Sequence, residues 1–515
     1  MLIIVLDQMR PDYVERFDME NVAELMAGGV NYQRAILGHM AAETVITHNV
    51  LTSGMLPKHM GWSNEVMRDT DDVFGSAEGE YIVTSSMGCG QFATLVQHEG
   101  YPKLGDYLDD VDAAGDARFV SIGQKTTASC NAGQPADAND IVVRAGSAAA
   151  NNCDGGDPES WRPPAGVNVP SYISTVCGRY YMNVTPTYGT ATTAPAWMYP
   201  LDGDRFAIGT STDRVGGDVW TADAAIDVMR NAPDWDGMLV SFPSIDKMAH
   251  MWGTDDTGPS GVGEDTFDFA HLPEVASIAD EQVGNLIAEL EDQGIRDETL
   301  IVLTTDHAGQ TAHRFHGVNQ AGRSNFNWYY GQDADETYKD PAPDLAPLVP
   351  GNPNVDFTYQ DGHIAVFLND TSAAAMRQAA VDVRELPDVI AAYYRVGDHY
   401  VRHGSLGPMS GKEFAWWVRY GQRLVDTMAA DYGPDVVGLM RDDTSYGVMG
   451  DHGGHQRAVQ DIPIVFSWPG IEAGATPGTE IRSVDIMPTI LRLMGISADP
   501  AHPMDGRAVK LPLAE

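Results

Sequence analysis

The chain has 515 residues, and its 32 Lys and Arg against 73 Asp and Glu give a formal net charge of −41 at pH 7. Such acidity argues against a nucleic-acid-binding module, because contacts to a phosphate backbone need clusters of basic residues. With 43% hydrophobic and 20% charged residues, the composition is that of a folded globular protein, and no run approaches the roughly 18 apolar residues of a membrane span.

The chain opens with a short apolar run, residues 1–6, that ends in Asp7. No basic segment accompanies it, so we expect a first β-strand and not a signal peptide. The same pattern recurs where GMLVSFPSID ends at Asp246 and where TLIVLTTDH ends at Asp306 and His307. Short β-rich runs separated by helical patterns predict a parallel sheet, and such sheets bind ligands at the carboxyl ends of their strands. Three Asp residues at three such ends therefore predict a site.

Helices are expected between these runs. Residues 221–231 and 276–293 carry apolar side chains at helical spacing, and Gly294 supplies a stop after the second stretch. Strand, helix and strand in this order predict βαβ units.

Two long stretches depart from the strand–helix rhythm. Residues 126–215 are rich in Gly, Asn, Thr, Pro and Asp and predict a long loop or a small β insertion. Residues 311–445 predict a subdomain or cap, because a loop of that length without structure of its own is improbable. We therefore expect an α/β core over residues 1–310, which includes the first insertion, then the cap, and a return to the core over residues 446–515.

The four cysteines show no CxxC spacing, which argues against a zinc–thiolate site. Cys130, Cys153 and Cys177 fall in the Gly- and Asn-rich stretch, where disulfide bonds would restrain loops, and Cys89 precedes it. We expect one or two disulfide bonds and an exported protein, secreted or periplasmic, whose export signal is absent from this sequence. Free thiols and a cytoplasmic location are the alternative.

Several short patterns have metal-binding potential. Asp246 and His250 are spaced i, i+4, which puts both side chains on one side of a helical turn. Asp306 and His307 are adjacent at a strand end and are ligand types that zinc accepts. His452 lies between glycines in GDHGGH. Separately, each pattern is as typical of an ordinary hydrogen-bonded pair or a turn as of a metal site.

Together with Asp7 and Thr44, these residues resemble the alkaline phosphatase superfamily in their order and contexts. The resemblance is carried by VLDQMRPDY, ETVITHNVLTSGMLPKHMGWSNE, SIDKMAHMWG, TTDHAG, MGDHGGHQRAVQDIPIVFSWPG, SVDIMPTILRLMGI and MDGR. The local pattern is most similar to the nucleotide pyrophosphatase/phosphodiesterase branch and its bacterial alkaline phosphatase relatives. Sulfatases need a Cys or Ser in a CxPxR-like motif, and the corresponding residues 44–48 contain neither, which argues against a sulfatase. The resemblance implies an α/β three-layer sandwich with a central, mostly parallel sheet and an inserted cap.

The resemblance also implies a site for two divalent metal ions, with zinc as the first choice. One ion would be held by Asp7, Thr44, Asp306 and His307. The other ion would be held by Asp246, His250 and His452. His455 is the alternative to His452. The charge of the three carboxylates is roughly offset by two divalent cations, so the centre can hold an anionic phosphoryl group although the whole chain is acidic.

Thr44 is the expected nucleophile, since coordination to a divalent cation stabilises the alkoxide of a threonine. The resemblance implies that Asn64 donates a hydrogen bond to a phosphoryl oxygen. Lys125 stands where some relatives that favour monoesters carry a Lys-x-Arg pair, but Thr127 takes the place of the Arg. A monoester dianion needs more cationic contact than a diester monoanion, so this difference favours diesters or pyrophosphates.

We therefore expect a metal-dependent hydrolase of a small phosphorylated substrate. Phosphodiesterase or nucleotide pyrophosphatase activity is the first choice, alkaline phosphomonoesterase activity the second and phosphonate hydrolase activity the third. A non-catalytic phosphate-binding member is the alternative from another class, but all the ligand positions are filled. The sequence predicts no oligomeric state. Further histidines and aromatic residues could line the site, although loop or core packing is the simpler interpretation for each of them: His313, His316, His363, Trp328, Tyr329 and Tyr330.

Overall fold

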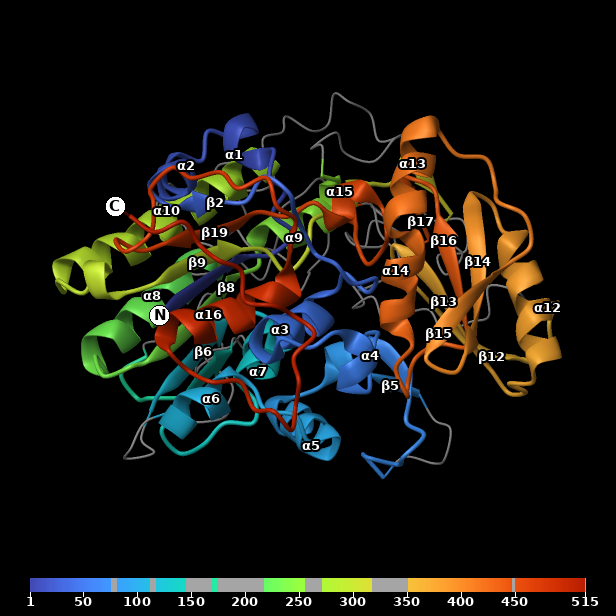
Figure 1. The fold of residues 1–515 in the computed structure, drawn as a ribbon, viewed down its shortest axis with the longest axis horizontal. Helices are drawn as coiled ribbons and strands as arrows, with labels where there is room; N and C mark the ends of the chain where they lie inside the picture. Colours follow the sequence, from blue (N-terminus) through green and yellow to red (C-terminus); the bar gives the residue numbers. More distant parts are fainter. Residues whose placement is uncertain are drawn as a thin grey trace, which may run out of the picture.

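The computed structural model contains two main sheets, a seven-stranded sheet flanked by helices and a five-stranded sheet beside it (Figure 1). The structure describes residues 1–75, 81–111, 117–144, 169–173, 217–254, 271–316, 351–446 and 450–514. Among these residues, no helix is long and apolar enough to cross a membrane.

The seven-stranded sheet is mostly parallel, as predicted. Strand β19 runs antiparallel to both of its neighbours, and the other pairs in the sheet are parallel. In spatial order the strands are β2 (Val30–Asn31), β19 (Ile464–Ser467), β9 (Ile301–Thr304), β1 (Leu2–Leu6), β8 (Gly237–Phe242), β6 (Phe119–Gly123) and β7 (Ile141–Arg144).

Helices cover both faces of this sheet, because successive side chains of a strand point to opposite faces. Leu2, Ile4 and Leu6 of β1 pack in one apolar cluster with side chains of the helices on that face, and Ile3 and Val5 pack in a second cluster on the other face. The first face is covered by α2 (Glu20–Gly28), α8 (Gly217–Asn231) and α10 (His271–Asp292), and the second by α6 (Leu104–Val111) and α16 (Ile486–Met494). The predicted three-layer sandwich is therefore confirmed (Figure 1).

The two predicted helices correspond to α8 and α10, both longer than expected at their N-terminal ends. Gly294 follows α10 with a φ of 72°, a left-handed conformation that favours glycine. Helices shorter than α8 and α10 complete this part of the molecule: α1 (Tyr13–Arg16), α3 (Thr44–Ser53), α4 (Pro57–Met60), α5 (Cys89–Glu99), α7 (Thr126–Gly133), α9 (Ser244–Trp252) and α15 (Arg457–Gln460).

The prediction of an insertion over residues 126–215 is wrong for residues 126–144. Residues 126–133 form α7, and residues 141–144 form β7, which pairs with β6 as an edge strand of the main sheet. The β6–α7–β7 unit belongs to the core, and it was hidden because β7 has only four residues and follows a turn rich in Asp and Asn. The rest of the expected insertion lies outside the described residues, apart from residues 169–173.

The second sheet falls within the residues predicted as a cap and is entirely antiparallel. Helix α12 (Ala373–Arg384) packs on one face, while α13 (Gly411–Trp416) and α14 (Gln422–Val425), joined by a π-helical turn, lie toward the other. Ile36 and Met40 from the core pack in that second cluster. The strand order is β12 (Val355–Gln360), β13 (His363–Leu368), β16 (Val436–Met440), β14 (Val389–Val396) and β15 (His399–His403).

Pairs of short strands connect loops through backbone hydrogen bonds. They are β3 (Ala35–Ile36) with β20 (Ile481–Arg482), β4 (Val66–Arg68) with β5 (Tyr81–Val83), β10 (Gln310–Thr311) with β18 (Gly450–Asp451), and β11 (Arg314–Phe315) with β17 (Thr444–Ser445).

A disulfide bond joins Cys89 of α5 to Cys130 of α7. It links two helices of the core and not two loops, contrary to the role expected for these cysteines. Cys153 and Cys177 lie outside the described residues.

Candidate active site

Three adjacent strands bring their carboxyl ends to one edge of the main sheet. Asp7 follows β1 directly, Asp306 and His307 follow β9, and Asp246 lies in the first turn of α9 after β8. Because β9, β1 and β8 are neighbours and parallel, these side chains meet, as the sequence predicted. All four are buried.

Gln8 shapes the turn that presents Asp7. Its φ of 60° is left-handed, which is unusual for a residue with a side chain and is held here by tertiary contacts. The Gln8 backbone N–H donates to Asp306 Oδ1 at 3.3 Å, and its side-chain amide donates to the Gly450 carbonyl at 3.1 Å. The turn after β1 is therefore fixed against the loop after β9.

Thr44 and Lys125 face this strand edge from two helices. Thr44 is the first residue of α3 and is 4% exposed. Lys125 precedes the first residue of α7, and its Nζ lies 2.6 Å from Asp7 Oδ2, 2.5 Å from Asp246 Oδ2 and 3.3 Å from Thr44 Oγ1. One ammonium group thus contacts two carboxylates and donates to the threonine hydroxyl.

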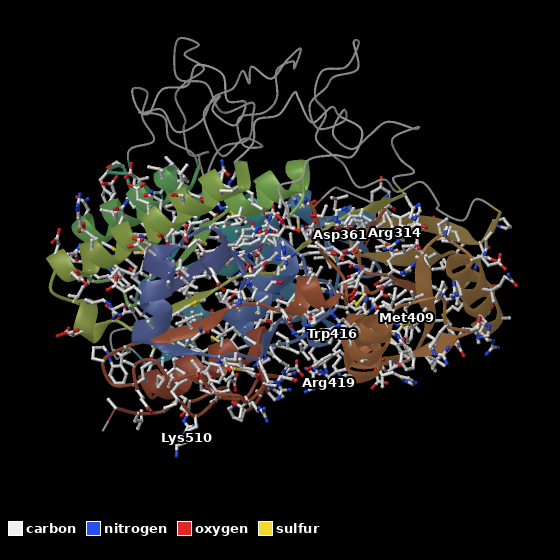
Figure 2. The ribbon with its side chains drawn as sticks, turned by 90° about the horizontal axis from the view of Figure 1, so that it is seen from above. Arg314, Asp361, Met409, Trp416, Arg419 and Lys510 are labelled. Atoms are coloured by element: carbon white, nitrogen blue, oxygen red, sulfur yellow. A yellow bond between two sulfur atoms is a disulfide. The ribbon has the colours of Figure 1, made fainter. Side chains whose placement is uncertain are left out.

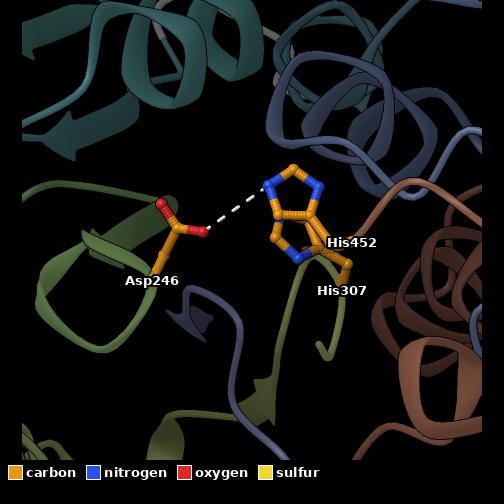
Figure 3. Close-up of side chains that lie close together, drawn as sticks. All are labelled: Asp246, His307 and His452. Carbon is orange, nitrogen blue, oxygen red and sulfur yellow. Dashed lines mark ion pairs between the residues drawn. The ribbon is translucent and has the colours of Figure 1, made fainter. Parts of the chain in front are cut away.

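Asp246, His250 and His452 converge on one point. His250 Nε2 lies 3.2 Å from Asp246 Oδ1 and 3.3 Å from His452 Nε2. His452 Nε2 lies 3.7 Å from Asp246 Oδ1, and Figure 3 shows this pair with His307 beside His452. His452 Nδ1 donates to the Ala42 carbonyl at 2.9 Å, so the lone pair of Nε2 faces the other two side chains. Ligands about 2.0–2.2 Å from a tetrahedral zinc ion lie about 3.3–3.6 Å apart, close to this spacing.

A second group consists of Asp7, Asp306 and His307. His307 Nε2 lies 3.6 Å from Asp7 Oδ1 and 3.6 Å from Asp306 Oδ2. These three buried atoms have no hydrogen-bond partner within the described part of the chain. The other Asp306 oxygen accepts from the backbone N–H groups of Gln8 and His307, at 3.3 and 2.9 Å, which aims the remaining oxygen into the group.

The electrostatics of this second group suit a cation. Burial first, and then the charges of Asp246 and Asp306, raise the pKa of Asp7 well above its ordinary value. Burial lowers the pKa of His307 to about 3, so its ring is neutral. Because His307 Nδ1 faces the Ala308 carbonyl at 3.3 Å, the proton lies there and Nε2 can act as a ligand. The donor atoms of Asp246, His307 and His452 lie within 4.8 Å of one another, as do those of Asp7, Asp306 and His307, so His307 belongs to both of these sets and His250 lies beside the first. Imidazole nitrogen with carboxylate oxygen fits zinc and similar divalent ions.

Comparison with known proteins decides the family. A model of the type I phosphodiesterase / nucleotide pyrophosphatase family matches residues 1–354. The chain belongs to this family. No curated protein sequence matches the chain.

Solved structures with the same fold include members of this family and an alkaline phosphatase. Murine and human ectonucleotide pyrophosphatase / phosphodiesterase 5 each align with a TM-score of 0.55 and 12% identity, over 97% and 98% of this chain and 96% of theirs. Wild-type alkaline phosphatase PafA aligns with a TM-score of 0.61 and 12% identity, over 99% of this chain and 97% of its own. At this identity the likeness shows the fold alone, which is that of the alkaline phosphatase superfamily.

The remaining predicted residues of this phosphodiesterase family member lie around the centre. Asn64 is buried, with its amide nitrogen 3.0 Å from His363 Nε2 and 3.3 Å from Glu43 Oε1; among the described residues, no hydrogen bond joins Asn64 to Thr44. The candidate metal groups found in the described ranges include His452 and not His455. His316 lies 2.8 Å from Asp388.

His363, the first residue of β13, is buried and donates from Nδ1 to the Gly453 carbonyl. His313 is exposed. Three aromatic candidates lie outside the described residues, namely Trp328, Tyr329 and Tyr330.

His48 supports the centre of this phosphodiesterase family member and was missed by the sequence analysis. Its Nδ1 donates to the Thr44 carbonyl at 2.9 Å, and its Nε2 accepts from the Ser241 hydroxyl at 3.1 Å. It therefore fixes the first turn of α3 to β8. The i, i+4 spacing of Thr44 and His48 on a helix was the available signal.

Proposed function

We propose that this protein hydrolyses phosphodiester or nucleotide pyrophosphate bonds through a covalent phosphothreonine at Thr44, with two divalent metal ions, zinc being the first choice. One observation carries the proposal. Two candidate metal-ligand groups that share His307, and the Thr44 hydroxyl, adjoin a single Lys125 ammonium, which contacts Asp7 from one group and Asp246 from the other.

Each residue of the centre has a part in this chemistry. The two ions would be held as the family resemblance implies, and when bound they lower the pKa of a coordinated hydroxyl and offset phosphoryl charge. The Thr44 oxygen attacks phosphorus in line, so that the bond from Thr44 to phosphorus forms as the bond to the leaving oxygen breaks. The leaving group takes up a proton, and water then cleaves the phosphothreonine.

Lys125 remains protonated throughout. Burial by itself would lower the pKa of Lys125, but the charges of Asp246 and Asp7 raise it above its ordinary value. Its ammonium therefore stabilises negative charge on the Thr44 oxygen, to which it donates at 3.3 Å. The N-terminus of α3 adds backbone N–H groups that favour an anion at the same place.

A preference for diesters is supported by the small number of cationic side chains expected at the centre. Lys125 is the one cationic side chain that the sequence analysis places there, and Thr127 stands where some relatives carry Arg. Preference for a monoester is the second candidate. An exported protein is part of the proposal, and the Cys89–Cys130 disulfide bond supports it.

The test compares initial rates of the zinc-loaded protein on bis(p-nitrophenyl) phosphate and on p-nitrophenyl phosphate, with Thr44→Ala as the control. We expect the diester to be preferred and Thr44→Ala to bind zinc at wild-type stoichiometry without turnover. Turnover by Thr44→Ala equal to that of the wild type would overturn the phosphothreonine. A higher kcat/KM for the monoester would identify an alkaline phosphomonoesterase instead.

A further inference from the structure

The turn between β12 and β13 brings the second sheet against the loop that carries His452. The turn consists of Asp361 and Gly362, between the ends of the two strands. Figure 2 shows Asp361 where the second sheet meets the rest of the molecule. This segment, YQDGH in the sequence, has no part in the proposed function above.

The contacts of this turn with the His452 loop are close. A Cβ added at Gly362 would lie 2.0 Å from the His452 carbonyl oxygen, so the two backbones approach as near as only glycine allows. The Gln456 side chain donates to the Gly362 carbonyl at 3.0 Å, and His363 donates to the Gly453 carbonyl. The turn is therefore docked on the loop through its backbone.

Asp361 reaches the ring of His452 itself. Asp361 Oδ2 lies 3.2 Å from His452 Nδ1, the atom that also donates to the Ala42 carbonyl. A Cβ at Gly453 would lie 2.3 Å from the same Asp361 oxygen, and Gly453 has a φ of 78°, so a glycine makes room for the carboxylate. The Asp361 side chain is 10% exposed.

We propose that Asp361 is a positioning residue, by which the cap orients His452 and strengthens it as a metal ligand. The proposal rests on the proposed function. A histidine ligand is oriented by the acceptor on its other ring nitrogen, and a carboxylate acceptor there makes the ligating nitrogen more basic. His452 Nδ1 donates to the Ala42 carbonyl of the core, Asp361 Oδ2 of the second sheet lies 3.2 Å from the same nitrogen, and Nε2 points at His250 and Asp246.

The experiment measures zinc binding to the metal-free full-length protein in competition with a chromophoric chelator. Variants are Asp361→Ala and Asp361→Asn, with Asp356→Asn as the matched control, since Asp356 is an exposed carboxylate on β12, the strand that precedes the turn. We expect Asp361→Ala to weaken one of two zinc equivalents by about 10- to 100-fold and to leave the other unchanged. Asp361→Asn keeps an acceptor oxygen and should recover part of the loss.

Activity gives a second readout. We expect the kcat of Asp361→Ala at low free zinc to fall and to return as free zinc is raised, which a purely structural defect would not do. Wild-type affinity for both equivalents in Asp361→Ala would overturn the proposal, as would an equal loss in the Asp356→Asn control. If Asp361→Ala fails to fold, Asp361→Asn takes its place in the test. Wild-type zinc affinity in Asp361→Asn, with a kcat that does not depend on free zinc, would then overturn the proposal. A wild-type protein that binds no zinc or has no phosphoesterase activity would instead contradict the proposed function.

Discussion

Lys125 is the residue whose replacement should affect the reaction most selectively. Its ammonium donates to Thr44 and pairs with Asp7 and Asp246. Removing one preorganised donor of this kind costs about 100-fold in kcat. We expect Lys125→Ala to lower kcat/KM by that factor for a diester and by more for a monoester, whose extra charge depends more on the cation.

The measurement is kcat/KM for both p-nitrophenyl substrates at saturating zinc, with zinc content determined in parallel. Lys412→Ala, an exposed lysine at the start of α13, is the matched control. An equal loss for the two substrates would show that Lys125 does not discriminate between them.

At the residue level, the sequence was sufficient for groups that follow a recognisable strand. Asp7, Asp246 and Asp306 each come after an apolar run, and parallel strands bring their carboxyl ends together. His48 and Asp361 could not be found in this way. The i, i+4 spacing of Thr44 and His48 indicates only that the two residues share one side of a helix. The distant contacts of His48 with Ser241 and of Asp361 with His452 appear in no local pattern.

Among the elements, β7 shows why local periodicity fails at a sheet edge. The strand contains only Ile141–Arg144, too few residues to establish a pattern, and its neighbours in sequence favour turns. Helix α7 was not predicted either, because its small and polar residues give the helix no clear apolar stripe. The core was therefore predicted too small by one βαβ unit, the unit that presents Lys125.

The disulfide bond between α5 and α7 should stabilise the fold without taking part in the reaction. Cys89 and Cys130 are separated by 41 residues, and closing a loop of this length in the unfolded chain is worth about 4 kcal/mol in the chain-entropy model. We expect the double variant Cys89→Ala, Cys130→Ala to have a lower Tm and to keep its kcat well below that Tm.

Thermal unfolding with and without reductant measures this effect. Reduction should lower the Tm of the wild type by more than that of the double variant, which retains only Cys153 and Cys177 and serves as the control. A Tm of the wild type that does not respond to full reduction would contradict the expected contribution of the bond.

For the whole molecule, the net charge of −41 opposes the approach of an anionic substrate. Salt screens this long-range repulsion, with a Debye length of about 10 Å at 0.1 M, but affects the buried contacts of the centre much less. We expect kcat/KM for a phosphoester to rise from low to moderate NaCl and then level off, with kcat nearly constant.

Initial rates across a sodium chloride series, repeated with choline chloride, test this expectation. Agreement between the two salts would attribute the rise to screening and not to a specific ion. A flat or falling kcat/KM in both series would show that the surface charge does not govern substrate approach.

The order of the strands in the main sheet also determines when the protein can fold during its synthesis. Strand β1 is the first to be made, yet its neighbours β8 and β9 begin only at Gly237 and Ile301. At a synthesis rate of about 5–20 residues per second, roughly ten to fifty seconds pass between the synthesis of β1 and that of its first neighbouring strand. During this time the fully apolar β1 segment has no strand to pair with. His452 and β19 arrive later still. A nascent chain released after Asp306 but before His452 would carry Thr44 and the three aspartates without a complete centre, so activity requires synthesis to proceed past His452 and β19.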